Sequence, residues 1–232
     1  MYHCEQNPIP TALRHAALGT LVEEYLSALP PERLQTEAHT QAEEALAEIF
    51  DIGGISKSPA IFDIDKLTHF NALYLRSMAP EEFAKVAEPY IRQSVKNPDL
   101  NAAEIAALLQ ARCEKLTDIP EKVDFFDALP DYDVNLFANK KSKSTLDSSK
   151  EMLSAAIGML ANLPSWSEAM IHDSLVGLAE GLGVKNALLM WPVRIAAAGK
   201  AVTPGGAVEI CHILGRKETV RRLKVGLEKL SQ

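Results

Sequence analysis

Histidines and cysteines are the side chains that metal binding or nucleophilic catalysis would need, and their spacing supports neither. The chain has three cysteines and six histidines, at Cys4, Cys113, Cys211, His3, His15, His39, His69, His172 and His212. No set has the spacing of a zinc site, and no base and orienting group accompany a nucleophile. We therefore expect no metal, no cofactor and no catalytic residue. Cys113 and Cys211 are interpreted as small buried hydrophobic residues.

Basic residues are concentrated near the C-terminal end. The formal net charge is −7, yet the residues from Lys185 onward hold nine basic and three acidic side chains, a local charge of +6. Such an end suits a phosphate backbone, and it equally suits a solvated helix face. If phosphates bind here, the candidate contacts are Lys200, Arg216, Lys217 and Arg221.

Composition indicates a folded helical protein. Of the 232 residues, 47% are hydrophobic and only 6% are aromatic, which permits a core and argues against stacked sheets. We find no apolar run long enough to span a bilayer and no secretion signal at the N-terminus. The odd cysteine count fits reduced thiols. We expect a cytoplasmic protein with no membrane partner.

Helical periodicity and helix-capping residues occur along most of the chain. In the first part, helices are predicted at Thr11–Leu29, Gln41–Phe50, Asp63–Met78, from Pro80, at Asn101–Lys115 and from Pro120. In the second part, helices are predicted from a Ser144 cap to Ala161, from a Ser165–Glu168 capping box to Gly181, and at Asn186–Ala198, Gly205–Leu214 and Arg216–Leu230.

The predicted fold is all-α. The polar stretch Pro130–Ser144 is interpreted as a hinge between two helical-bundle subdomains. We divide the chain into an N-terminal helical segment and linker, 1–59, and two subdomains, 60–143 and 144–232.

Three separated blocks carry a longer pattern. KSPAIFDIDKL begins at Lys57 and is followed by NALYLR from Asn71, LQARCEKLTDIPE begins at Leu109, and a third block runs from Gly183 to Leu223. The third block contains a Pro-x-Arg step and a Thr-Pro-Gly turn. In this order the blocks resemble the C-terminal, anticodon-binding region of bacterial-type glutamyl-tRNA synthetases. The resemblance covers about residues 43–232, and residues 1–42 lie where the family has its catalytic nucleotide-binding domain.

The resemblance implies that the chain binds glutamate tRNA and supplies its anticodon-reading residues. The family arginine that reads the third anticodon base, a cytosine, matches Arg112. A guanidinium only donates hydrogen bonds, and cytosine offers acceptors, whereas the guanine of glutamine tRNA would present donors. Without the flanking match, Arg112 would be interpreted as a solvent-facing residue of an amphipathic helix.

The resemblance also assigns a second group of anticodon-binding residues. The family's other anticodon arginine matches Arg194, and its turn matches Thr203 and Pro204, which could equally form a purely structural turn. Trp191 departs from the family pattern, and its indole either stacks on an unpaired base or packs in the core. Ala198 and Gly206 also depart from that pattern, replacing a hydroxyl and a larger apolar residue.

Two short motifs look like parts of a class I synthetase active site. Lys140–Ser144 (KKSKS) differs by one residue from the KMSKS signature, and His212–Gly215 begins like the H-x-G-H element. Neither lies beside an alternating strand–helix pattern of a nucleotide-binding sheet, so both are interpreted as chance matches. Ile55–Ser58 is a similar, weaker match.

The leading hypothesis is a tRNA-binding module that is a fragment or relative of glutamate–tRNA ligase and is not catalytic alone. Its expected partners are glutamate tRNA and a separate catalytic synthetase chain, but not DNA. The alternative is a repurposed helical interaction protein without tRNA specificity, with Thr11–Leu29 as a docking helix. An enzyme with an unrecognised site is a third hypothesis, for which the sequence offers no residues.

Overall fold

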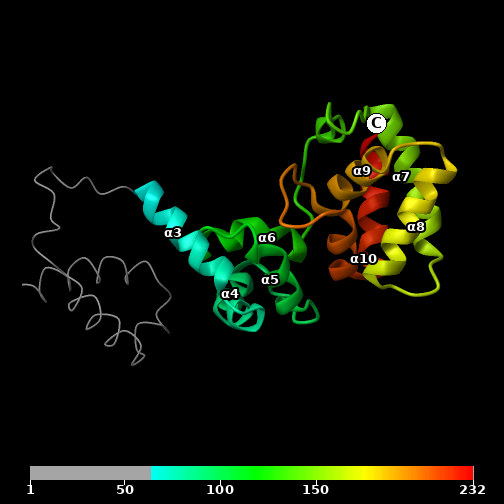
Figure 1. Cartoon of the computed structure of the whole chain (residues 1–232). Coiled ribbons are helices and arrows are strands. Elements are labelled where there is room, and N and C mark those ends of the chain that lie inside the picture. Colours follow the sequence, from blue (N-terminus) through cyan, green and yellow to red (C-terminus); the bar gives the residue numbers. More distant parts are fainter. Residues whose placement is uncertain (1–63, 232) are drawn as a thin grey trace, which may run out of the picture. The chain divides into compact units, whose positions relative to one another are not determined.

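The structure is a computed structural model that describes residues 64–231 (Figure 1). These residues form α-helices with no β-strand, which confirms the predicted all-α class. The α-helices are α3 (Ile64–Ser77), α4 (Pro80–Ser94), α5 (Ala102–Gln110), α6 (Ile119–Asp127), α7 (Leu146–Ala161), α8 (Glu168–Gly181), α9 (Asn186–Ala198) and α10 (Ala207–Lys229). The helices predicted at Thr11–Leu29 and Gln41–Phe50 lie outside the described residues.

Helix α4 packs against both α5 and α6, and the three form the first helical group. Pro80 begins α4, where its missing N–H costs nothing, and Asn101 caps α5 by accepting a hydrogen bond from the Ala103 amide. Helix α5 ends at Gln110, so the prediction of a helix to Lys115 was wrong. Beyond Gln110 the chain forms a turn and then a short 3₁₀-helix, Leu116–Asp118. The buried residues Cys113 and Leu116 in this stretch continue the helical spacing of apolar residues, so periodicity alone did not show where α5 ends.

Helices α7 to α10 form the second group, in which α10 contacts the other three (Figure 1). The cap of α7 is Thr145 rather than Ser144: Thr145 and Ser148 form a reciprocal capping box. The buried Ser144 hydroxyl instead donates to the carbonyl of Phe137, which lies in the 3₁₀-helix Val134–Phe137. Ser167, not Ser165, caps α8.

Helix α10 contains a kink where two helices were predicted. Gly215 has φ 75° and ψ 163°, a non-helical conformation that separates the segments on either side. A left-handed φ favours glycine because a Cβ would be strained there. The predicted break after Leu214 therefore exists, although the helix resumes at once.

Arg222 of α10 joins the two helical groups. Its side chain is fully buried, and Nη1 donates to the carbonyls of Phe125 (2.7 Å) and Ala197 (2.8 Å). Nη2 reaches the Phe126 carbonyl at 3.4 Å, and Nε donates to Glu218 at 2.6 Å. From Asp65 onward the chain forms one compact unit, and the boundary between 143 and 144 stays a prediction. No helix within residues 64–231 is both long and apolar enough to cross a membrane.

Candidate nucleic-acid interface

The loop between α9 and α10, residues 199–206, is the centre of the candidate site. Gly199 ends α9 with φ 66°, and a Cβ there would lie 2.9 Å from side-chain atoms of Pro130 and Tyr132. Both the backbone conformation and the close approach therefore require glycine. Thr203 and Pro204 are buried in this loop, whereas the Val202 residue is 84% exposed.

Arg112 reaches this loop from the turn after α5. Its Nη1 donates to the carbonyls of Thr203 and Pro204, each at 3.2 Å. The residue is otherwise exposed, and its Nε and Nη2 groups have no hydrogen-bond partner among the described residues. The first helical group thus contributes an arginine to a loop of the second.

Arg194 approaches the same loop from α9. Its Nη1 donates to Thr203 Oγ1 at 2.7 Å, and its Nη2 donates to the Ala201 carbonyl at 3.0 Å. The guanidinium carbon lies 4.6 Å from the ring centroid of Trp191, one helical turn earlier. The Trp191 indole N–H donates to the Leu136 carbonyl at 2.9 Å, and the half-buried ring packs against the hydrophobic core. We call Arg112, Trp191, Arg194, Thr203 and Pro204 the arginine cluster.

The arginine cluster carries positive charge without a counterion. Within residues 64–231, no carboxylate lies at ion-pair distance from Arg112 or Arg194, and their acceptors are neutral oxygens. Burial, and then the neighbouring charge of Arg112, lower the pKa of Arg194. The group stays charged at neutral pH, but its environment favours an added anion or hydrogen-bond acceptor.

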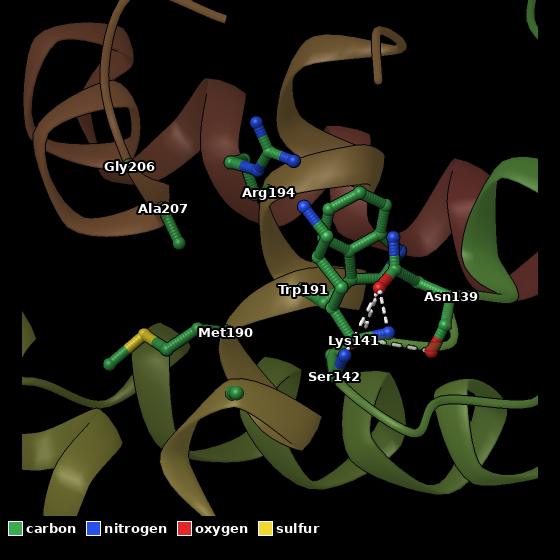
Figure 2. Close-up of a pocket in the computed structure, with 9 residues that line it drawn as sticks. Asn139, Lys141, Ser142, Met190, Trp191, Arg194, Gly206 and Ala207 are labelled. Carbon is green, nitrogen blue, oxygen red and sulfur yellow. Dashed lines mark hydrogen bonds between the residues drawn. The ribbon is translucent and has the colours of Figure 1, made fainter. Parts of the chain in front are cut away.

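A pocket of about 360 Å³ opens beside this cluster (Figure 2). Trp191 and Arg194 form part of its lining; the other lining residues are Asn139, Lys141, Ser142, Ala187, Met190, Gly206 and Ala207. Residues 139–142 were not among the predicted site residues. The KKSKS motif does mark this segment in the sequence, but we compared the motif only with a catalytic loop and did not consider an RNA-binding role.

The four phosphate-contact candidates have different surroundings, and none of them lines this pocket. Lys200 donates to the Asp124 carboxylate and to the Glu121 carbonyl. Arg221 forms a two-bond pair with Glu218, and Arg216 lies over the Trp166 ring at 5.6 Å. Lys217 is exposed on α10. Their role as phosphate contacts stays a prediction.

The remaining reactive residues have structural surroundings. Cys113 and Cys211 are buried free thiols, as expected, and burial raises the pKa of Cys113 to about 11 and that of Cys211 to about 12. Both are therefore protonated and poor nucleophiles at neutral pH. His212 lies within α10, with Nε2 3.9 Å from a Glu104 oxygen.

An all-helical fold with paired arginines and a tryptophan beside an open pocket has the groups that bind unpaired nucleic-acid bases. Residues 82–227 match the family model described as an anticodon binding domain. The match spans more than half of the chain, and the chain belongs to the anticodon-binding domain family.

Curated relatives and solved structures agree with this assignment. The chain is 46% identical over 187 residues to the glutamate–tRNA ligase of Clostridium tetani and 39% identical over 189 residues to that of Clostridium acetobutylicum. These matches cover 81% and 82% of this chain but only 38% and 39% of the relatives. A glutamate–tRNA ligase structure from Elizabethkingia meningosepticum matches with a TM-score of 0.66 at 23% identity, over 81% of this chain and 37% of that one. That likeness shows the fold.

Proposed function

We propose that this chain is a tRNA-binding module that reads the anticodon of glutamate tRNA. The observation that carries the proposal is the arginine cluster: Arg112 and Arg194, from different helical groups, hold one loop while their charges remain uncompensated. Family membership and the similarity to glutamate–tRNA ligases support a tRNA as the ligand that supplies acceptors and negative charge.

Arg112 has donors available for a base. One terminal nitrogen is held by the Thr203 and Pro204 carbonyls, which fixes the plane of the guanidinium. Nε and Nη2 remain for the O2 and N3 acceptors of a cytosine, the third anticodon base of glutamate tRNA. On the same base edge, a guanine would present its N1–H and N2–H donors to the arginine, so the arrangement favours glutamate over glutamine tRNA.

The pocket suits an unpaired base. Trp191 is held by its indole hydrogen bond and contacts the Arg194 guanidinium, so an entering base meets a fixed aromatic and cationic wall. Stacking of a base on such a wall contributes about 1–3 kcal/mol and tolerates any base. We assign affinity mainly to this pocket and base preference mainly to Arg112.

Ligation of glutamate would take place elsewhere in this proposal. The chain spans about two fifths of the length of its curated relatives, and its described residues provide the tRNA-reading part of such an activity. A separate catalytic synthetase chain is the proposed second partner, and the cytoplasm is the proposed location.

The test is binding of the purified chain to unmodified glutamate and glutamine tRNAs at two salt concentrations. We expect salt-sensitive binding that prefers glutamate tRNA, and an Arg112→Gln variant that loses about tenfold or more of this preference. Arg76→Gln, the same charge change at an exposed arginine of α3, is the matched control and should keep the preference. Absent binding, or equal weak binding to both tRNAs, would contradict the proposal and favour the interaction-protein alternative.

A further inference from the structure

The turn of residues 139–144, here called the lysine turn, holds cations that the fold does not use. Lys140, Lys141 and Lys143 are all exposed, and none of their ammonium groups has a hydrogen bond or ion pair within the part of the chain that the structure describes. Three other cations of the second group are paired with carboxylates: Lys200 with Asp124, Lys229 with Asp131 and Arg222 with Glu218.

The backbone of the lysine turn is fixed. Asn139 and Ser144 exchange two backbone hydrogen bonds, of 3.0 and 3.1 Å. The Asn139 side-chain oxygen accepts from the amides of Lys141 (2.9 Å) and Ser142 (3.0 Å). Ser144 anchors the turn to the buried Phe137 carbonyl, and Lys143 has φ 59°. Those two amides are already bonded, whereas the three exposed ammonium groups are available to an anion.

The lysine turn forms one wall of the pocket beside the arginine cluster. Asn139, Lys141 and Ser142 line the pocket together with Trp191 and Arg194 (Figure 2). Figure 2 shows Lys141 and Gly206 on different sides of the pocket, and a Cβ on Gly206 would lie 2.8 Å from a Glu209 carboxylate oxygen. The Glu209 carboxylate therefore lies near Gly206, on one side of the pocket, whereas the lysine turn places a cation, Lys141, on another side.

We propose that the lysine turn binds the phosphodiester backbone of the single-stranded RNA whose base enters the pocket. This inference rests on the proposed tRNA-binding function and adds a phosphate site to the base site. A base held against Trp191 carries its own phosphates past the pocket, which Lys141 lines, and Lys140 and Lys143 are exposed on the same rigid turn. Phosphate contacts supply salt-dependent affinity and position the strand, but carry no base preference.

The test compares two triple variants of the full chain. Lys140→Ala/Lys141→Ala/Lys143→Asn removes the three cations, and asparagine is chosen at 143 because it tolerates a left-handed φ. Lys85→Ala/Lys96→Ala/Lys122→Ala makes the same charge change in the first helical group, within α4, just after α4 and within α6. Binding to unmodified glutamate and glutamine tRNAs is measured between about 50 and about 200 mM salt, and circular dichroism checks that both variants fold.

We expect the turn variant to bind glutamate tRNA about tenfold more weakly at low salt, with the slope of log affinity against log salt shallower by about 1–2. The preference for glutamate over glutamine tRNA should not change, and the control variant should keep most of the slope. A turn variant indistinguishable from the control would overturn this inference alone, as would an altered tRNA preference. Failure of the unaltered chain to bind either tRNA would overturn the proposed function, and the inference with it.

Discussion

Two regions of this molecule use arginine to hold backbone carbonyls, and they differ in what balances the charge. At the junction of the helical groups, Arg222 binds three carbonyls and the Glu218 carboxylate and is fully buried. In the arginine cluster, the partners of Arg112 and Arg194 within residues 64–231 are neutral oxygens, and the cluster lies beside an open pocket. The Glu218 carboxylate neutralises the charge of Arg222 within the protein, whereas the charges of Arg112 and Arg194 are available to an anionic ligand.

The difference separates stability from binding. Removing the fully buried arginine of the junction costs much, because its buried carbonyl partners are left without a donor. Two neighbouring positive charges contribute little to the stability of the fold, and their electrostatic energy becomes more favourable when a ligand supplies negative charge or acceptors. We therefore expect substitutions at the junction to change unfolding and substitutions in the cluster to change RNA binding.

The largest effect is expected at the junction itself. Arg222→Met leaves the buried carbonyls of Phe125 and Ala197 without their donor and removes one of the two arginines that bind Glu218, and should lower the free energy of unfolding by about 3–5 kcal/mol. Arg221→Met is the control, since Arg221 pairs with the same carboxylate but its side chain is 56% exposed, and should cost about 0–1 kcal/mol. Urea unfolding measures both. Equal losses of unfolding free energy in the two variants would contradict the claim that the buried Arg222 stabilises the fold more than the exposed Arg221.

In the arginine cluster, the opposite pattern is expected. Arg194→Met should weaken glutamate tRNA binding by about 10- to 100-fold, because it removes a cation from the pocket wall. Its free energy of unfolding should fall by no more than about 1 kcal/mol, since relief of repulsion from Arg112 offsets the lost hydrogen bonds. Filter binding and urea unfolding on the same preparation decide this. A large loss of stability with unchanged affinity would make the cluster a structural element.

The junction should also respond to pH. Hydrogen bonds from Arg221 and then Arg222 lower the pKa of Glu218 to about 2. Because this folded-state pKa lies below the ordinary value of 4.5, Glu218 stabilises the fold above pH 4.5 and loses this contribution as the pH falls toward 2. Glu218→Gln should therefore cost about 1–2 kcal/mol at neutral pH, a figure reduced for solvent screening, and progressively less below pH 4.5. A constant difference from neutral to acid pH would contradict this assignment.

The smallest effect is expected at Lys200, a cation near the cluster that already has a carboxylate. Because Lys200 is paired with Asp124, Lys200→Ala should change glutamate tRNA affinity by no more than about twofold. Binding at low salt, beside the variant of the lysine turn, provides the comparison. If Lys200→Ala lost as much affinity as the turn variant, an ion pair within the protein would not determine which cations bind RNA.

Local signals predicted much of the fold. Helix α9 has the predicted bounds, because Gly199 stops it with a left-handed residue. The caps of α7 and α8 were misplaced by one and two residues, since neighbouring hydroxyl residues look alike in sequence. The end of α5 was missed because apolar spacing continues beyond Gln110.

Contacts distant in sequence were not predicted from local patterns. Arg112 meets Thr203 and Pro204 across 91 and 92 positions, and only the family resemblance brought these residues together. The burial of Arg222 was missed because a basic residue in a basic helix looks solvated. Its carbonyl partners lie as far as 97 positions away, where no sequence periodicity reaches.

The most direct test of the central claim is a double-mutant cycle between Arg112→Gln and a cytosine-to-guanine change at the third anticodon base of glutamate tRNA. Affinities of the four combinations give the coupling between this arginine and this base. If Arg112 reads the base, the cytosine preference should fall with the substitution, for a coupling of about 1–3 kcal/mol. Additive effects, with a coupling near zero, would show that Arg112 only supports the loop and that the chain does not read this base through it.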